Sequence, residues 1–203
     1  EGGAALHGCT HRVIGDRIVC ATYLCAAAAA GGEVRLTGVD YRAVSTVALS
    51  LAESGCEVRS EADAVSLRST GALRSVRPVR TAPYPGFPTD AQPVLMAALL
   101  RSEGCTVFVE NIFENRYRHV DELSRMGAEI RVAGRVAVVN GVRTLHGAAV
   151  KCTDLRGGAA LVIAGLSAEG TTRVTELTHI DRGYDAIERD LAALGAQIRR
   201  ETT

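Results

Sequence analysis

The sequence contains no tryptophan, and aromatic residues make up only 4% of it. A core must therefore be packed from Ala, Val, Leu and Ile, within an apolar share of 47% over 203 residues. That share allows a sizeable core, in one large domain or two small ones. There is no apolar run long enough to cross a bilayer, and no signal peptide is visible at Glu1. We therefore expect a cytoplasmic protein.

An excess of either charge is also lacking, because 23 Lys and Arg balance 23 Asp and Glu. No global field attracts nucleic acid or an anionic membrane, and we expect neither as a partner. Lys151 is the one lysine, and every other basic residue is Arg. Since such a bias can be genomic, the number of arginines does not by itself indicate phosphate binding.

Metal-binding and disulfide patterns are missing too. The six cysteines are scattered without CxxC spacing, and the five histidines show no metal-ligand spacing. We interpret the cysteines as reduced, mostly buried thiols in a cytoplasmic protein. Neither a metal site nor another cofactor is expected.

A proline-rich stretch, residues 80–90, stands out against this background. Three of the five prolines fall within residues 83–88, which makes the backbone extended and stiff. Helical spacing of apolar residues begins directly after it, at Ala91. The loop thus delivers Asp90 to a helix start. Asp90 is either a capping residue or a carboxylate fixed at the rim of a cleft, able to take a proton from a substrate hydroxyl.

The same order of elements occurs three times along the chain. Each copy has an Asp at a helix start, a helix ended by glycine, a β-branched strand, a second helix and a further strand. The helix-start residues are Asp16, Asp90 and Asp154. The strands after the first helices are expected at 33–37, 106–110 and 171–175, and the later ones at 56–60, 128–132 and 196–200. Hairpin partners are expected at 64–69 and 136–140.

We therefore expect an α/β fold of the two-layer α+β kind, with three β-α-β-α-β-β units over about 8–70, 76–140 and 142–203. The three units would form a single domain, residues 1–203. The third unit stops before its last strand, which would leave an unpaired sheet edge. The missing last strand and the absent initiator Met suggest that this chain is a piece of a larger protein.

The units differ in the loops between the middle strand and the second helix. Longer loops occupy 112–119 and 177–184, and they carry Arg116 and Arg182. Arg156 lies in the first turn of the helix that follows Asp154. If these loops share one rim, their guanidinium groups suit a phosphate or carboxylate ligand. The alternative is that each Arg pairs with a neighbouring carboxylate on a solvated surface, which contributes little.

Five segments in these regions resemble a known family. They are residues 85–90 (PGFPTD), 112–120 (IFENRYRHV), 125–128 (RMGA), 153–156 (TDLR) and 179–184 (HIDRGY). In this order they resemble the UDP-N-acetylglucosamine 1-carboxyvinyltransferases, which are bacterial enolpyruvyl transferases. The resemblance runs from about Gly8 to Arg200 and corresponds to the C-terminal half of those enzymes. It implies three β-α-β-α-β-β units in a pseudo-threefold inside-out α/β barrel.

The resemblance also implies a reaction. The family transfers the enolpyruvyl group of phosphoenolpyruvate to the 3-hydroxyl of UDP-N-acetylglucosamine and releases phosphate, the first committed step of peptidoglycan biosynthesis. This chemistry requires a base, an acid and cations that hold phosphate and carboxylate. By the family's pattern, Asp90 contacts the sugar and is the candidate base, and Arg182 contacts phosphoenolpyruvate. The other matching positions in the cleft are Ile112, at the sugar nucleotide, and Arg116, Asp154 and Arg156.

The family's reactive cysteine and its Lys-Asn pair belong to a half that this sequence does not contain. We therefore expect this polypeptide alone to lack transferase activity. A 3-phosphoshikimate 1-carboxyvinyltransferase, with the same architecture and donor, is an alternative. The HIDRGY segment at residues 179–184 argues against it. A non-catalytic binding module on the same scaffold is a third possibility.

Overall fold

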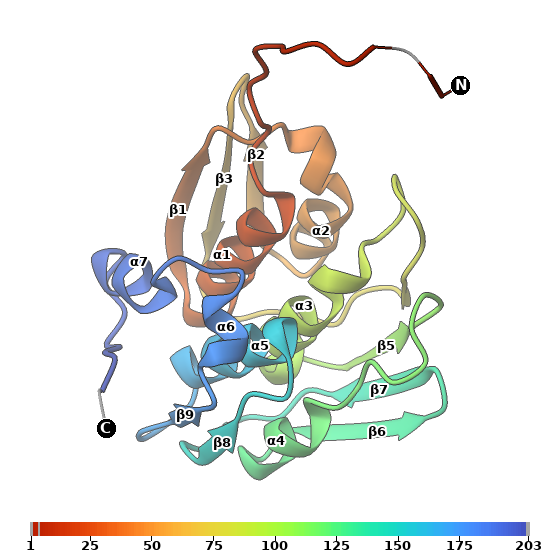
Figure 1. Cartoon of the computed structure of the whole chain (residues 1–203). Coiled ribbons are helices and arrows are strands. Elements are labelled where there is room, and N and C mark those ends of the chain that lie inside the picture. The colour runs from red at the N-terminus through yellow and green to blue at the C-terminus, as the bar shows by residue number, and fades with distance from the viewer. Residues whose placement is uncertain (1, 4, 202–203) are drawn as a thin grey trace.

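The structure is a computed structural model that describes residues 2–3 and 5–201. Its elements follow the chain in three groups (Figure 1). The first comprises α1 (Arg17–Ala30), β1 (Gly32–Thr37), α2 (Tyr41–Glu53), β2 (Glu57–Ser60) and β3 (Ala64–Ser69). The second comprises β4 (Val79–Arg80), η1 (Thr89–Ala91), α3 (Gln92–Ala98), η2 (Leu99–Arg101), β5 (Cys105–Val109), α4 (Val120–Arg125), β6 (Glu129–Ala133) and β7 (Val136–Asn140). The third comprises β8 (Ala149–Lys151), α5 (Leu155–Leu166), β9 (Arg173–Thr175), α6 (Thr178–Asp181) and α7 (Ile187–Ala193).

Each group builds its own small sheet. The strand order is β1-β3-β2 in the first, β4-β5-β7-β6 in the second and β8-β9 in the third. The hairpins predicted at 64–69 and 136–140 are formed, because β3 and β7 pair antiparallel with both of their neighbours. The short strands β4 and β8 instead lie parallel to β5 and β9. Along the chain, η1 is the next element after β4, and α5 is the next element after β8.

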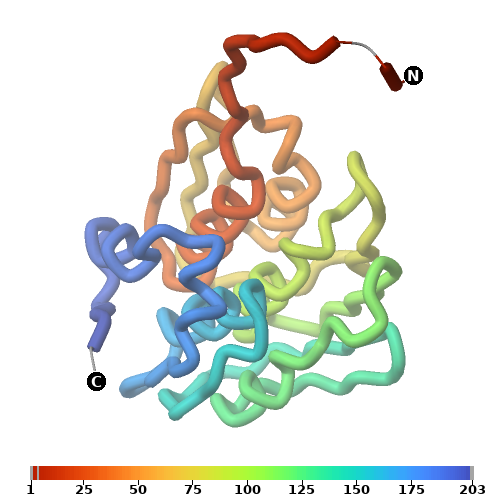
Figure 2. The backbone as a smooth tube through the Cα atoms, viewed as in Figure 1, coloured from red at the N-terminus to blue at the C-terminus, as the bar shows by residue number. Residues whose placement is uncertain are grey.

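The centre of the molecule is helical. Helices α1, α3 and α5 pack on one another, and α1 also packs on β1 and β3, so that the sheets lie outside the helices (Figures 1 and 2). Every residue of α3 is buried. Small residues also let α6 approach α5 closely. A Cβ on Gly158 of α5 would come within 2.7 Å of the Ile180 side chain of α6. The predicted core of Ala, Val, Leu and Ile is confirmed.

One of the strands predicted by residue range is not formed in the described residues. The stretch 196–200, predicted as a strand, is irregular. Its main-chain bonds are local, from Ala196 N to Leu191 O (2.9 Å) and from Ile198 N to Ala196 O (3.1 Å). The part of the first unit that precedes its helix, residues 8–16, is also without a strand and leads away from the sheets (Figure 2). A strand requires a hydrogen-bonded neighbour, and neither stretch has one among residues 2–3 and 5–201.

Two of the three aspartates predicted at helix starts cap a helix, and the third does not. Asp16 caps α1, accepting from Ile18 N at 2.7 Å, and Asp154 caps α5, accepting from Gly157 N at 2.9 Å. Asp90 does not cap a helix: it lies inside the 3₁₀ turn η1, and no side-chain cap bond is recorded at the start of η1 or of α3. The glycines predicted to end helices adopt positive φ, including 79° at Gly31 and 96° at Gly104. A carboxylate that is not needed as a cap is free for other contacts.

The cysteines are largely buried, as predicted. The buried thiols are Cys20, Cys25, Cys56 and Cys152, the exposed ones are Cys9 and Cys105, and each is free. Within the part of the chain that the structure describes, no helix combines the length and the apolarity needed to cross a membrane.

Candidate functional site

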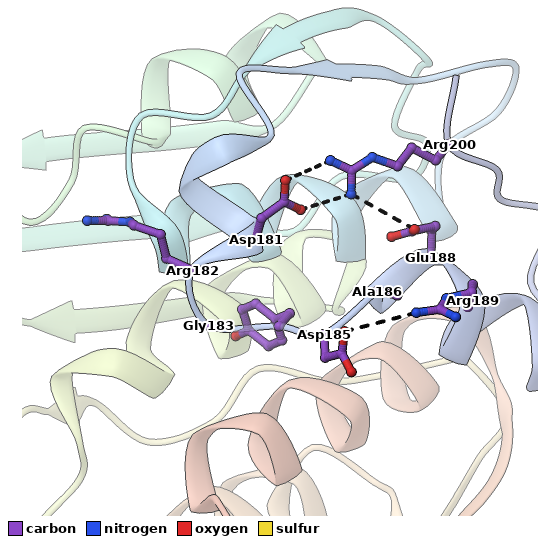
Figure 3. A pocket seen from close by; sticks show the side chains of 9 residues that line it. Asp181, Arg182, Gly183, Asp185, Ala186, Glu188, Arg189 and Arg200 are labelled. Atoms are coloured by element: carbon purple, nitrogen blue, oxygen red, sulfur yellow. Dashed lines mark hydrogen bonds and ion pairs between the residues drawn. The ribbon is translucent and has the colours of Figure 1, made fainter. Parts of the chain in front are cut away.

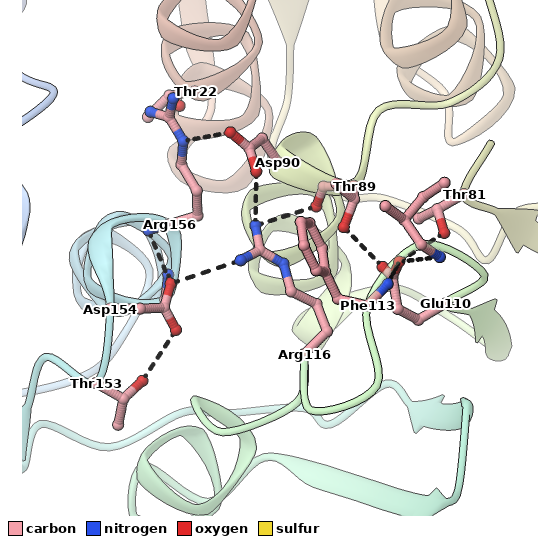
Figure 4. Close-up of polar contacts among 12 residues, drawn as sticks. Thr22, Thr81, Thr89, Asp90, Glu110, Phe113, Arg116, Thr153, Asp154 and Arg156 are labelled. Carbon is pink, nitrogen blue, oxygen red and sulfur yellow. Dashed lines mark hydrogen bonds and ion pairs between the residues drawn. The ribbon is translucent and has the colours of Figure 1, made fainter. Parts of the chain in front are cut away.

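Asp90 lies at the centre of an ion-pair network between two loops and a helix. Its Oδ1 accepts from Arg116 Nη2 at 2.9 Å and its Oδ2 accepts from Arg156 Nε at 3.3 Å. Figure 4 shows the two guanidinium groups reaching Asp90 from different elements, Arg116 from the loop after β5 and Arg156 from α5. The capping interpretation of Asp90 is therefore wrong, and the interpretation of Arg116 and Arg156 as solvated surface pairs is wrong as well.

Burial makes these contacts stronger than ordinary surface pairs. The side chains of Arg116 and Arg156 are only 14% and 11% exposed, whereas that of Asp90 is 41% exposed. A guanidinium withdrawn from water requires a close counter-charge, because an unpaired buried charge is strongly destabilising. Asp90 supplies that charge to both and keeps one side open to solvent. Asp90, Arg116 and Arg156, which the sequence placed on separate segments, thus meet at one place.

Asp154 extends the network. Besides capping α5, its Oδ1 lies 3.9 Å from Arg116 Nη1. Burial works to raise the pKa of Asp154, but the Gly157 amide and the Arg116 charge outweigh it and hold this pKa below its usual value. Arg116 thus lies between two carboxylates, one on η1 and one at the start of α5.

Arg156 is held from its other side by Tyr184. Arg156 Nη1 donates to Tyr184 Oη at 3.0 Å, and its guanidinium lies 5.4 Å from the centre of the tyrosine ring. Burial opposes the positive charge of Arg156, yet Tyr184 and Asp90 together raise its pKa above the ordinary value. Tyr184 Oη also lies 2.8 Å from Thr22 Oγ1. Because Thr22 donates to Ile18 O, Tyr184 is the donor to Thr22.

His119 lies beneath this network. It is fully buried, and burial lowers its pKa to about 4. Neither ring nitrogen has a hydrogen-bond partner among the described residues, and the same holds for the neighbouring Arg116 Nε. The imidazole is therefore neutral above that pKa.

Arg182 is not part of the network. It follows α6, is exposed, and lines an open hollow of about 740 Å³. The residues lining that hollow are 181–186, 188, 189 and 200. Figure 3 shows Arg182 extending away from the ion pairs of Arg200, and the Arg182 side chain forms no hydrogen bond or ion pair within residues 2–3 and 5–201. The expected meeting of Arg182 with Asp90 is not seen, although Tyr184, two residues further on, touches Arg156.

Ile112 lies on the exposed side of the loop that follows β5. It is 38% exposed, and its amide donates to Glu110 Oε1 at 2.8 Å. The family pattern assigned Ile112 a place at the sugar nucleotide, and its exposure leaves the side chain accessible. Glu110, Thr22 and Tyr184 are polar residues of the site that sequence reasoning missed. The one available signal was the position of Tyr184 inside the HIDRGY segment.

A metal centre has no support in this geometry. Among residues 2–3 and 5–201 there is no group of three or more His, Cys, Asp or Glu side chains able to hold a metal ion. The arrangement instead offers one oriented carboxylate with an open side, Asp90, and an exposed arginine, Arg182, two residues before the Tyr184 that touches Arg156. These are groups that can bind a hydroxyl and an anion.

Comparison with known proteins defines the class. A sequence model described as EPSP synthase (3-phosphoshikimate 1-carboxyvinyltransferase) matches residues 1–191. The enolpyruvyl transferase NikO from Streptomyces tendae superposes with a TM-score of 0.82 at 31% identity, covering 92% of this chain and 44% of that one. The fold is that of the enolpyruvyl transferases, as predicted.

Curated relatives narrow this class. The UDP-N-acetylglucosamine 1-carboxyvinyltransferase of Gluconacetobacter diazotrophicus is 52% identical over 98% of this chain and 47% of its own length. That of Desulfofundulus thermocisternus is 51% identical over 98% of this chain and 82% of its own length. The chain belongs to the family of UDP-N-acetylglucosamine 1-carboxyvinyltransferases. It spans about half the length of most of the curated relatives it matches.

Proposed function

We propose that this chain forms one domain of an enzyme that transfers the enolpyruvyl group of phosphoenolpyruvate to the 3-hydroxyl of UDP-N-acetylglucosamine, releasing phosphate, in peptidoglycan biosynthesis. The observation that carries the proposal is the oriented, half-open carboxylate of Asp90 between Arg116 and Arg156. The names of the chain's relatives supply the acceptor, UDP-N-acetylglucosamine, and the 1-carboxyvinyl group that is transferred.

Asp90 is the proposed base. Two of the lone-pair sites on its carboxylate are occupied by guanidinium donors, which fixes the orientation of the group. The exposed side retains acceptor capacity for the proton of the sugar hydroxyl. When the hydroxyl oxygen attacks the enol carbon, this proton passes to Asp90, and a general acid protonates the terminal methylene carbon to give the tetrahedral intermediate. Loss of a proton from the resulting methyl group then expels phosphate and restores the carbon–carbon double bond, which completes the transfer.

The three arginines have separate tasks in this proposal. Arg116 and Arg156 are committed to Asp90, Asp154 and Tyr184, so they orient the base. Arg182 is exposed and has no such partner in the described part of the chain, which leaves its guanidinium available for the phosphate or carboxylate of phosphoenolpyruvate. Ile112 would line the sugar-nucleotide side.

The test uses a protein with the full length of the relatives. It should release phosphate from phosphoenolpyruvate only when UDP-N-acetylglucosamine is present, whereas residues 1–203 alone should release none. Arg182→Ala should raise KM for phosphoenolpyruvate by about tenfold or more, since a charge-assisted contact is lost. Arg118→Ala, on an exposed arginine of the other long loop, is the matched control. Equal effects of the two substitutions would contradict the assignment of Arg182.

The description of the matching family model favours one competitor, 3-phosphoshikimate as acceptor. Competition between this acceptor and UDP-N-acetylglucosamine decides between them in the same assay. We expect only the sugar nucleotide to support phosphate release.

A further inference from the structure

Glu110 is a buried carboxylate outside the ion-pair network. It directly follows β5 and is only 1% exposed. No Arg, Lys or His forms an ion pair with it within residues 2–3 and 5–201. A carboxylate buried without a counter-charge requires full hydrogen bonding.

Four donors meet this requirement. Oε1 accepts from Thr81 Oγ1 at 2.9 Å, Ile112 N at 2.8 Å and Phe113 N at 3.1 Å. Oε2 accepts from Thr89 Oγ1 at 2.9 Å. The two backbone amides can only donate, and the Thr81 hydroxyl already accepts from the amide of Asn111 at 2.8 Å. Glu110 therefore acts as an acceptor for groups from separate segments.

Two of those segments hold residues of the ion-pair network: η1 contains Asp90, and the loop after β5 contains Arg116. Thr89 precedes Asp90 in η1, and its carbonyl accepts from Arg116 Nη2 at 3.3 Å. Phe113 lies in the loop that bears Arg116, and its ring centre lies 5.8 Å from that guanidinium. Figure 4 shows Glu110 on the strand side, between Thr81 and Thr89.

We propose that Glu110 is a positioning residue that fixes the Asp90 turn relative to the loop of Ile112 and Arg116. It does so through geometry, as an acceptor for both segments, and it does not touch substrate. The consequence for a sugar-nucleotide ligand rests on the proposed function, because Ile112 and Asp90 would lie on the two sides of that ligand. The structural claim concerns this chain alone.

Amide hydrogen exchange of residues 1–203, followed by NMR, tests the structural claim. In Glu110→Ala the amides of Ile112 and Phe113 should exchange about tenfold faster or more, because their charged acceptor is gone. Amides in the β6–β7 ladder, which lie on other strands of that sheet, provide the internal reference. Unchanged exchange at Ile112 and Phe113 would overturn the proposal.

Glu110→Gln separates geometry from charge. The amide oxygen can replace Oε1 for its three donors, and the amide nitrogen can donate to the Thr89 hydroxyl. Exchange at Ile112 and Phe113 should then stay within about threefold of the parent chain. Exchange as fast as in the alanine variant would show that charge, not acceptor geometry, matters, and the proposal would fail.

Thr89→Val covers the case in which the alanine variant does not fold. It removes the bond to Oε2 and leaves the three donors on Oε1. We expect unchanged exchange at Ile112 and Phe113, with exchange of the Arg116 guanidinium protons faster by about threefold or more, as the Asp90 turn loosens. Unchanged guanidinium exchange would contradict the coupling of the two segments.

A kinetic arm addresses the ligand. In the full-length protein, Glu110→Ala should raise KM for UDP-N-acetylglucosamine by about tenfold or more, and Glu110→Gln should restore it to within about threefold. If this arm fails while the exchange results hold, the positioning role stands and the proposed substrate is wrong. If the exchange arm fails, the positioning role is wrong whatever the substrate.

Discussion

Two arginine-rich regions of this chain contrast in burial. Around Asp90, two nearly buried guanidinium groups share one carboxylate and are tied to Asp154 and Tyr184. Around Arg182, the arginines are more exposed, and the ion pairs are those of Arg200 with Asp181 at 2.6 Å and Glu188 at 4.0 Å and of Arg189 with Asp185 at 4.0 Å. The sequence motifs look alike, since each loop carries Arg beside an acid or amide. What distinguishes the arginines around Asp90 from Arg182 is the burial of their side chains.

This difference assigns different tasks to chemically identical groups. Arginines committed to internal partners orient a neighbouring group, because moving them would leave buried charges unpaired. An exposed arginine without internal contacts remains able to bind an incoming anion, at the cost of ordering its side chain. Asp90 and Arg182 are therefore expected to respond differently to substitution, pH and salt.

The largest effect is expected from Asp90→Ala. In the full-length protein, turnover should fall about 100-fold or more with the loss of the base. The chain should also lose about 1–3 kcal/mol of unfolding free energy, because Arg116 and Arg156 lose their shared partner. Phosphate-release kinetics and urea unfolding measure the two losses.

Asp16→Ala is the matched control for Asp90→Ala. It removes a carboxylate that caps α1 and lies outside the network. A loss of about 1 kcal/mol in stability with unchanged turnover is expected. If the two aspartates gave the same ratio of lost activity to lost stability, Asp90 would have no special role.

A pH effect should follow from His119. Its pKa is about 4 in the folded chain and near 6.5 when exposed, so the unfolded state binds the proton more readily. The unfolding free energy should therefore be highest above pH 6.5 and fall as pH drops towards 4, by about 3 kcal/mol in all. Urea unfolding between pH 4 and 7 measures this slope.

Substitution tests the source of the slope. His119→Gln should remove most of it, whereas His179→Gln, on the Arg182 side of the molecule, should leave it in place. A slope that survived in the His119 variant would mean that other groups titrate in this window.

An intermediate effect is expected from Tyr184→Phe. The change removes the hydroxyl that accepts from Arg156 and donates to Thr22, and leaves a buried donor unpaired. We expect a loss of about 1–3 kcal/mol in unfolding free energy and a lower turnover in the full-length protein. Tyr23→Phe, which cuts the bond to Asp190 between α1 and α7, should lower stability without lowering turnover. Equal turnover in the two variants would contradict the inference that Tyr184 helps to orient Asp90 through Arg156.

Much of the fold followed from local pattern. The stripes of buried residues on α1, α2 and α5, the caps at Asp16 and Asp154 and the positive-φ glycines all depend on short-range rules. The strand predicted at 196–200 failed because apolar alternation does not supply a hydrogen-bonded neighbour. Pairing is a long-range property that a single segment does not encode.

The site divides in the same way. The family motifs contained Asp90, Arg116, Asp154 and Arg156, and the structure brings these four together. Nothing in the sequence indicated that Thr22 and Glu110 would contact residues of the site. Thr22 lies in an alanine-rich helix and Glu110 ends an alternating strand, where a charged side chain is ordinarily taken to face solvent. Their roles depend on contacts with residues distant in sequence.

The smallest effect is expected on the Arg182 side. Arg200→Ala removes the partner of Asp181 and Glu188, but the side chains of Arg200 and Asp181 are 38% and 41% exposed. Water solvates either charge when the other is removed, and the ordered pair already has an entropic cost, so the midpoint of urea unfolding should not change measurably. Added salt should also leave it unchanged, since screening acts on an interaction that contributes little. A shift as large as that of Tyr184→Phe would mean that the two regions are equally coupled to folding. Burial would then no longer separate the arginines that orient Asp90 from the one left free to bind an anion.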